Sequence, residues 1–171
     1  MYKRYSDMPI IIILIIAFSV AADQVTKSLI FGADSAFIPG FIRFESVENR
    51  GMAWGLLNGT NGSIIILSVL TVLSSALIVF ILIRYWKKLN NPIKIGLACI
   101  LGGGFGNLID RVFVGFVRDF ICTEFIKFPV FNVADAFVTC GAILIIFALV
   151  FTKSGRKMMV EIITEETAKK A

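Results

Sequence analysis

The chain has 171 residues, of which 57% are hydrophobic and only 17% are charged, and its net charge is +5. Soluble domains are about 25% charged and about 45–50% apolar, so this composition excludes an ordinary soluble domain and indicates a membrane protein. There is no histidine, which excludes a Ser-His-Asp or Cys-His nucleophile and an HExxH zinc site and leaves carboxylates, lysine or hydroxyl groups for any catalysis.

Four apolar stretches are long enough to cross a bilayer, which requires about 20 helical residues. The first is expected over about 8–30. A charge-free stretch of 33 residues, 51–83, is too long for one helix, and the turn-forming sequence at 58–62 divides it, so the second span is placed at about 63–83. The other two are expected at about 92–111 and 129–152. The sequence thus predicts an all-α integral membrane protein with one domain, 1–171.

The connection between the first two spans differs from the others in length and composition. It carries several large aromatic side chains, which favour the membrane interface, and polar and apolar residues alternate over 41–47. Alternation of this kind predicts short β-strands. We therefore expect a small β-containing segment that lies on the membrane or over a substrate.

The positive charges predict the orientation of the spans. Eleven of the 17 lysines and arginines lie in the N-terminus, the 84–94 connection and the C-terminal tail, whereas eight of the 12 acidic residues lie in or beside the other two connections. Both termini are therefore expected in the cytoplasm. The small-x-small sequence at 19–21 imitates a signal-peptide cleavage site, but removing the first span would place the two basic regions on opposite sides.

The polar residues near the spans gather at one level rather than at the middle of the bilayer. Embedded charges cost roughly 2.5–3.5 kcal/mol each at a helix centre on insertion scales, so they mark functional candidates. The candidates here are six charged residues and two asparagines, which lie at outer span ends or in the connection between the third and fourth spans: Asp23, Lys27, Asn107, Asp110, Arg111, Asp119, Asn132 and Asp135. The sequence therefore predicts a polar cluster facing the outer leaflet.

Helical spacing places Gly103, Asn107 and Asp110 on one face of the third span, because they are four and three residues apart. The surrounding glycines, 102–106, are not a nucleotide-binding loop, since no strand precedes them. They predict close packing against a neighbouring helix.

Two further pairs stand at helical spacing. Asn132 precedes Asp135 by three residues, so its amide is expected to hydrogen-bond and orient that carboxylate. Asp23 and Lys27, four residues apart, predict an ion pair, for which a structural role is the simpler interpretation.

Asp119 and Asp135 are the candidates for catalysis. Two neighbouring carboxylates that share one proton can activate a water molecule, as in aspartic proteases. The alternative is structural, with Asp119 paired to Arg118 or Arg111 and Asp135 paired to Lys27. Spacing leaves both interpretations open.

Five ordered segments resemble the bacterial lipoprotein signal peptidases, also called signal peptidase II. The most specific are Gly103-Gly-Phe-Gly-Asn-Leu-Ile-Asp-Arg111, Val117-Arg-Asp-Phe120 and Phe131-Asn-Val-Ala-Asp-Ala136. Asp23-Gln-Val-Thr-Lys27 and Asn49-Arg-Gly-Met-Ala-Trp54 also agree with blocks of that family. The resemblance extends over nearly the whole chain.

This resemblance implies an aspartyl endopeptidase of the bacterial cytoplasmic membrane that removes signal peptides from prolipoproteins, cutting before a cysteine that carries diacylglyceryl. Asp119 and Asp135 would form the catalytic dyad. The positions that support or line the site would be Asp23, Lys27, Asn49, Gly103, Asn107, Asp110, Arg111, Asn132 and Ala136. We expect no metal or cofactor, a monomer, and prolipoproteins and membrane lipid rather than nucleic acid as partners.

The chain departs from the family pattern at three positions. Arg118 stands where a small apolar residue is usual, and Met52 and Trp54 replace the commoner Ala and Phe. A cation beside Asp119 would favour the ionised carboxylate. The alternatives from other classes are a small proton-coupled transporter, which would need an ionisable group near the midplane of a span, and a non-catalytic assembly protein.

Overall fold

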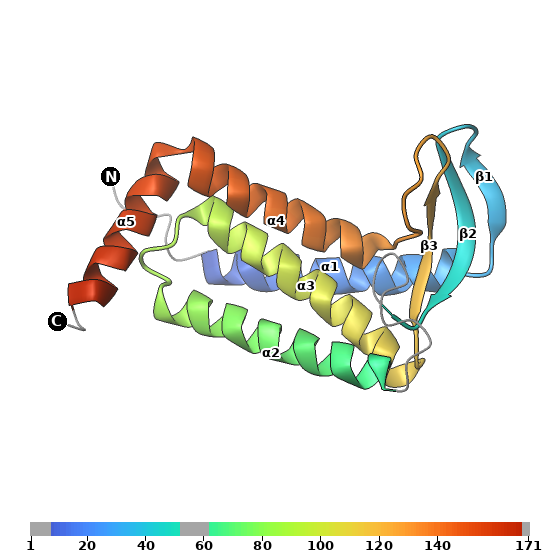
Figure 1. Ribbon diagram of the computed structural model, residues 1–171, viewed down its shortest axis with the longest axis horizontal. Helices are drawn as coiled ribbons and strands as arrows, with labels where there is room; N and C mark the ends of the chain where they lie inside the picture. The colour runs from blue at the N-terminus through green and yellow to red at the C-terminus, as the bar shows by residue number, and fades with distance from the viewer. Residues whose placement is uncertain (1–7, 52–61, 169–171) are drawn as a thin grey trace.

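The structure, a computed structural model, describes residues 8–51 and 62–168. Four helices in it are long and apolar enough to cross a membrane: α1 (Met8–Ile30), α2 (Ser63–Arg84), α3 (Asn91–Phe113) and α4 (Val133–Phe151). Figure 1 shows them running along the length of the molecule, with a small sheet at one end. The predicted four-helix membrane fold is confirmed. Met52, Trp54 and most of the turn at 58–62 lie outside the described residues, as do the charged residues of 1–7 and 169–171.

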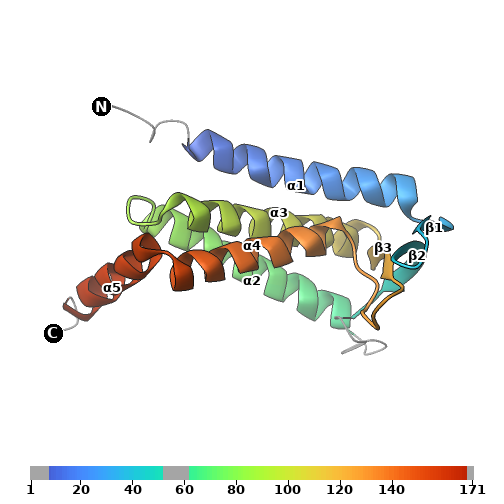
Figure 2. The same cartoon turned by 90° about the horizontal axis from the view of Figure 1, so that it is seen from above.

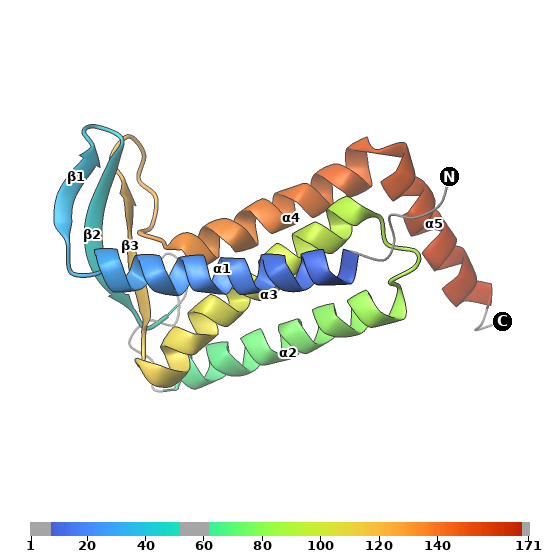
Figure 3. The ribbon, with the colours of Figure 1, turned by 180° about the vertical axis from the view of Figure 1, so that it is seen from behind.

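Helix α3 forms the centre of the bundle, packed against α1, α2 and α4. Figure 3 shows α1 crossing α3 on the face opposite to the view of Figure 1. Half of the most apolar stretch of α3 is buried inside the protein, whereas only 11–22% of the corresponding stretch is buried in each of the other three helices. This burial explains why polar side chains are tolerated on α3, since its neighbours rather than lipid surround them.

Glycines on α3 allow the close helix contacts that the sequence predicts. A Cβ atom at Gly102 would lie 2.5 Å from Cβ of Ser19 on α1, and one at Gly103 would lie 2.3 Å from the carbonyl oxygen of Ala134 on α4. One at Gly106 would lie 2.6 Å from a carboxylate oxygen of Asp23. These glycines therefore set the spacing between the three helices that carry the polar cluster.

Replacing Gly103 by alanine is expected to destabilise the protein by about 1–3 kcal/mol, because the added methyl group overlaps the backbone of α4. Gly104 provides a matched control. Its Cβ would meet side chains only at 3.7 Å or more, so Gly104→Ala should be neutral or stabilising, as expected for Ala in a helix. Thermal unfolding of both variants in detergent measures the difference, and equal midpoints would contradict the packing role.

Three antiparallel strands form the sheet in the order β1 (Asp34–Ile38), β2 (Ile42–Asn49) and β3 (Val117–Thr123). The first two lie in the long connection after α1, where a β-containing segment was predicted, and β2 covers most of the alternating pattern at 41–47. The third comes from the connection between α3 and α4, where no strand was predicted. It pairs Val47 with Asp119 across β2 and β3, which brings the two outer connections together beside the helix ends.

The end of the bundle opposite the sheet holds a helix that was not predicted, α5 (Lys153–Ala168). Figure 2 shows it beyond the end of α4, and Figure 1 shows that it turns away from the line of α4. The other difference concerns the fourth span, which begins at Val133 rather than near 129 because Asn132 is its N-cap.

Candidate active site

A capping box at the start of α4 fixes the position of Asp135. The side-chain oxygen of Asn132 accepts a hydrogen bond from the Asp135 backbone N–H at 3.0 Å, and Oδ2 of Asp135 accepts one from the Asn132 backbone N–H at 3.2 Å. Such reciprocal bonds satisfy two of the free N–H groups at a helix start. Asn132 and Asp135 are thus bonded to each other, but the carboxylate is oriented by the backbone N–H of Asn132 and not, as the spacing had predicted, by its side-chain amide.

The side-chain amide of Asn132 is directed instead to the other carboxylate. Its Nδ2 donates to Oδ1 of Asp119 at 2.6 Å, and Nδ2 of Asn49 on β2 donates to Oδ2 of Asp119 at 2.8 Å. Asn132 therefore contacts both aspartates. One residue at a helix start links the carboxylate of β3 to the carboxylate of α4.

Asn107 on α3 completes the network around the two carboxylates. Its Nδ2 donates to Oδ1 of Asp135 at 2.8 Å, and its Oδ1 accepts from Nζ of Lys27 at 2.9 Å and from Nδ2 of Asn132 at 3.0 Å. Because both lone pairs of the Asn107 carbonyl are occupied by donors, its amide group can only present its N–H to Asp135.

Behind this network lies a cluster of buried charges between α1 and α3. Lys27 is fully buried, 2.8 Å from Asp23 and 3.3 Å from Asp110. Asp23 also accepts a hydrogen bond from the backbone N–H of Ala134 at 2.9 Å. The predicted Asp23–Lys27 ion pair is therefore present, and it also joins α1 to the start of α4.

Arg118 belongs to this cluster and is directed away from the neighbouring carboxylate. Its backbone N–H and its guanidinium donate to Asp110 at 2.8–3.2 Å, and the guanidinium also donates to Gln24 at 3.0 Å. The alternative in which Asp119 pairs with Arg118 is therefore not what the structure shows. Gln24 also belongs to the cluster, since it donates hydrogen bonds to both Asp23 and Asp110. Sequence reasoning missed this residue, although a polar amide inside a predicted span could have marked it.

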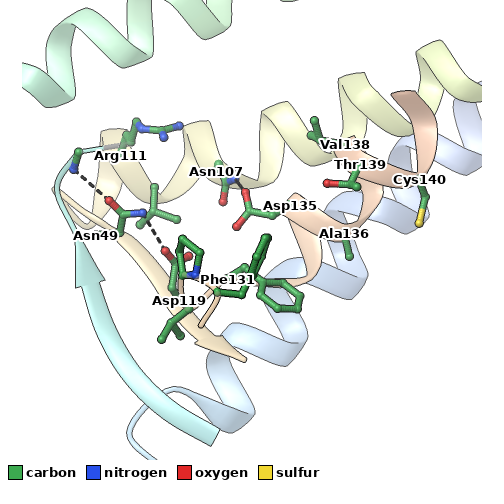
Figure 4. Close-up of a pocket in the computed structure, with 15 residues that line it drawn as sticks. Asn49, Asn107, Arg111, Asp119, Phe131, Asp135, Ala136, Val138, Thr139 and Cys140 are labelled. Carbon is green, nitrogen blue, oxygen red and sulfur yellow. Dashed lines mark hydrogen bonds between the residues drawn. The ribbon is translucent and has the colours of Figure 1, made fainter. Parts of the chain in front are cut away.

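A cavity of about 560 Å³ lies beside the two aspartates. Figure 4 shows Asp119 on β3 and Asp135 on α4 bordering the same space, with Asn49 and Asn107 bonded to them. Arg111 and Ala136 also line this cavity, whereas Gly103 does not and serves in packing. Sequence reasoning did not predict the apolar wall of this cavity, which includes Val117, Phe128, Phe131 and Val138.

Asp119 is buried, with 2% of the residue exposed. Burial and the nearby carboxylate of Asp135 raise the pKa of Asp119 to about 7, while the hydrogen bonds from Asn49 and Asn132 act in the opposite direction. Burial disfavours the charged carboxylate, and a second negative charge disfavours it further. Asp119 is thus poised to hold a proton in the physiological range.

Any reaction that needs the proton on Asp119 is expected to slow as pH rises above about 7. Asn49→Ala removes a donor that favours the ionised form, so it should move this decline to higher pH by about one pH unit, besides lowering the rate. The single-turnover rate, followed across about pH 5–9, measures the midpoint. Glu48→Gln, on the same strand, should leave it unchanged, and a shift to lower pH in Asn49→Ala would contradict the assignment.

Among the described residues 8–51 and 62–168, no group of three or more Cys, Asp or Glu side chains is arranged to hold a metal ion. Within the same ranges, every buried side-chain nitrogen or oxygen has a hydrogen-bond partner. The arrangement suits acid–base chemistry, because two carboxylates held by asparagine amides border one cavity and the pKa of Asp119 is raised.

A multi-span helical protein whose cavity is lined by paired carboxylates, in a chain without histidine, has the features of a membrane aspartic peptidase. The comparisons with known proteins agree. The family model described as Signal peptidase (SPase) II matches residues 15–151, which leaves α5 outside the matched region. The chain belongs to the signal peptidase II family and is an aspartic peptidase of a bacterial membrane.

Two relatives and one solved structure illustrate the similarity. The lipoprotein signal peptidase of Enterococcus faecalis is 38% identical over 153 residues, which cover 86% of this chain and 92% of that protein. That of Staphylococcus aureus strain MRSA252 is 37% identical over 152 residues, covering 85% and 91%. A bacterial membrane enzyme solved by the in meso method at 2.3 Å resolution superposes with a TM-score of 0.75 at 36% identity, covering 87% of this chain and 92% of that one.

Proposed function

We propose that Asp119 and Asp135 are the catalytic dyad of an endopeptidase that removes the signal peptide from diacylglyceryl-modified prolipoproteins, cutting before the lipidated cysteine. The observation that carries the assignment is the shared cavity, at which both carboxylates are held by Asn132 and by one further asparagine each. Chain 1–171 would act as one domain and as a monomer, since every group of this site comes from a single chain.

In the reaction that this site supports, the ionised member of the dyad takes a proton from a water molecule. The water oxygen attacks the carbonyl carbon of the scissile peptide, while the protonated member donates a hydrogen bond to the carbonyl oxygen. Collapse of the tetrahedral intermediate breaks the C–N bond, and a proton passes from a carboxyl group to the leaving amine. The raised pKa of Asp119 favours this residue as the one that holds the proton at rest.

Lateral entry of a lipidated substrate accounts for the apolar part of the cavity. Its wall continues along α4 to Thr139 and Cys140, which are exposed on the surface of that helix. The signal peptide, and the acyl chains on the cysteine that follows it, would therefore reach the carboxylates from the bilayer without crossing water. The distribution of lysine and arginine supports cytoplasmic termini, with the sheet and the cavity at the outer leaflet of the cytoplasmic membrane.

The substrate assignment is tested with one purified precursor prepared in two forms, with and without diacylglyceryl on its cysteine. We expect cleavage of the lipidated form and a new N-terminus at the modified cysteine, identified by mass spectrometry. The unmodified form should be cleaved at least about a hundredfold more slowly, because acyl chains supply binding energy in proportion to the apolar surface they bury. Equal cleavage of both forms would contradict the proposed substrate class.

A further inference from the structure

Helix α5 has two apolar faces, of which one is already covered by the protein. Met158 is buried against Leu82 and Leu89, at the end of α2 and in the following connection, and Ile162 packs against the same cluster. Glu165 forms an ion pair with Lys88 on this side. This face fixes α5 across the end of the bundle that lies opposite the sheet, as Figure 1 shows.

The other apolar face is uncovered. Met159, Val160 and Ile163 are 42%, 63% and 59% exposed. They stand at i, i+1 and i+4, so their side chains form one stripe along the helix. Uncovered apolar stripes on short helices at the end of a membrane bundle are typical of helices that lie in the bilayer interface.

Positive charges lie beside the N-terminal end of this stripe. Lys153, Arg156 and Lys157, in the first turns of α5, are all exposed. Helical spacing places Arg156 in the same row as Met159, Val160 and Ile163. Of the acids on α5 whose side chains the structure describes, Glu165 is directed to Lys88 of the bundle. The exposed Glu161 is two residues from both Met159 and Ile163, which places it on another side of the helix. The charge beside the stripe is therefore complementary to an anionic surface.

The stripe also continues the surface of α4 that faces lipid. Phe147, Val150 and Phe151 at the end of α4 are 55%, 52% and 67% exposed. The guanidinium of Arg156 donates a hydrogen bond to the carbonyl oxygen of Val150, so a basic residue of α5 stands where the two surfaces join. An arginine at this level is well placed for phospholipid headgroups.

We propose that α5 lies in the headgroup region of the membrane at the end opposite the sheet, with Met159, Val160 and Ile163 inserted among the acyl chains and with Lys153, Arg156 and Lys157 bound to anionic phospholipid. None of these residues lines the catalytic cavity, so this anchor is separate from the peptidase site. It holds the end of the bundle at a fixed depth in the membrane.

The test uses the full chain with a photoreactive benzophenone amino acid at Ile163 and, as a matched control, at Glu161, which is exposed on another side of the helix. The protein is reconstituted in vesicles of phosphatidylglycerol and phosphatidylcholine in equal amounts, illuminated and analysed by mass spectrometry. We expect phospholipid adducts at position 163 to exceed those at position 161 by about fivefold. Equal adducts at both positions, or cross-links at position 163 to protein alone, would overturn the proposal.

The charge requirement is tested in the same vesicles. Adducts at position 163 should favour phosphatidylglycerol over phosphatidylcholine by about fivefold. Lys153→Gln/Arg156→Gln/Lys157→Gln should bring this ratio close to one. A preference that survives the triple substitution would overturn the assignment of these residues as the anionic-lipid site. Because the readout is lipid contact rather than cleavage, its outcome is independent of the proposed dyad.

Discussion

Asp119→Asn and Asp135→Asn should each lower the single-turnover rate of precursor cleavage by at least about a thousandfold. Each substitution removes a group that must exchange a proton with water or with the leaving amine, and such groups contribute roughly 10²–10⁴ in rate. Asparagine keeps the shape and an oxygen acceptor for the bonds from Asn49, Asn107 and Asn132. The loss should therefore occur in folded protein.

The double variant Asp119→Asn/Asp135→Asn should be no worse than either single one, because residues that act as a unit are not additive. Asp34→Asn is the matched control, since Asp34 lies on β1 and pairs with Arg43 at the surface. It should retain normal processing. A gel shift of lipid-modified precursor measures cleavage, and thermal unfolding in detergent verifies the fold. Either single variant cleaving at the normal rate would remove that residue from the dyad.

Lys27→Met should destabilise the protein by about 3–5 kcal/mol, the usual consequence of removing one partner from a buried ion pair. The ammonium group of Lys27 is fully buried between Asp23 and Asp110, and methionine would leave one negative charge uncompensated beside Arg118. Activity should fall as well, because Lys27 also holds the carbonyl oxygen of Asn107, whose amide bonds to Asp135.

A second substitution distinguishes charge imbalance from lost packing. Lys27→Met/Asp23→Asn restores neutrality to the cluster and should recover part of the stability. Lys88→Met is the control for a lysine in a more exposed ion pair, whose partner Glu165 is 45% exposed, and it should cost at most about 1 kcal/mol. Thermal and denaturant unfolding in detergent give these differences. Equal losses for Lys27→Met and Lys88→Met would contradict the structural role of the buried cluster.

The position of Arg118 explains how a departure from the family pattern is accommodated. Its side chain is directed to Asp110 and Gln24 rather than to the adjacent Asp119, because successive side chains of a strand point to opposite faces. The buried cluster then contains two cations and two carboxylates, which is a neutral set. Asp119 retains a raised pKa despite an arginine next to it in the sequence.

The four spans could be predicted because crossing a bilayer demands a long apolar helix, and this demand is visible residue by residue in the sequence. Hydropathy falls short at the ends of the spans. It gave residue 129 as the start of the fourth span, whereas α4 starts at Val133 because Asn132 caps it. Hydropathy also did not predict α5, because this helix mixes apolar with charged residues. Its position depends on the packing of Met158 in the core of the bundle.

The sheet shows a second limit of sequence reasoning. Alternation over 41–47 predicted strand structure where β2 lies, but it did not mark β1, and β3 carries Asp119 within a short connection without a clear pattern. Strand pairing depends on which segments meet across the sheet, and here Val47 pairs with Asp119 and Asn49 with Val117. Residues about 70 positions apart in the chain became neighbours only through this register.

By itself, the sequence determined that the protein lies in a membrane, how many helices cross it and which kind of chemistry is available to it. The chain is apolar, has no histidine and carries a few acids at the ends of its spans. Only the tertiary structure decided which polar groups serve which carboxylate. The side-chain amide of Asn132 was expected to bond to the carboxylate of Asp135, yet its Nδ2 bonds to Asp119 while its Oδ1 caps α4. Helical spacing reports neighbours on one element, whereas a site assembled from α1, α3, α4 and two strands depends on how those elements pack.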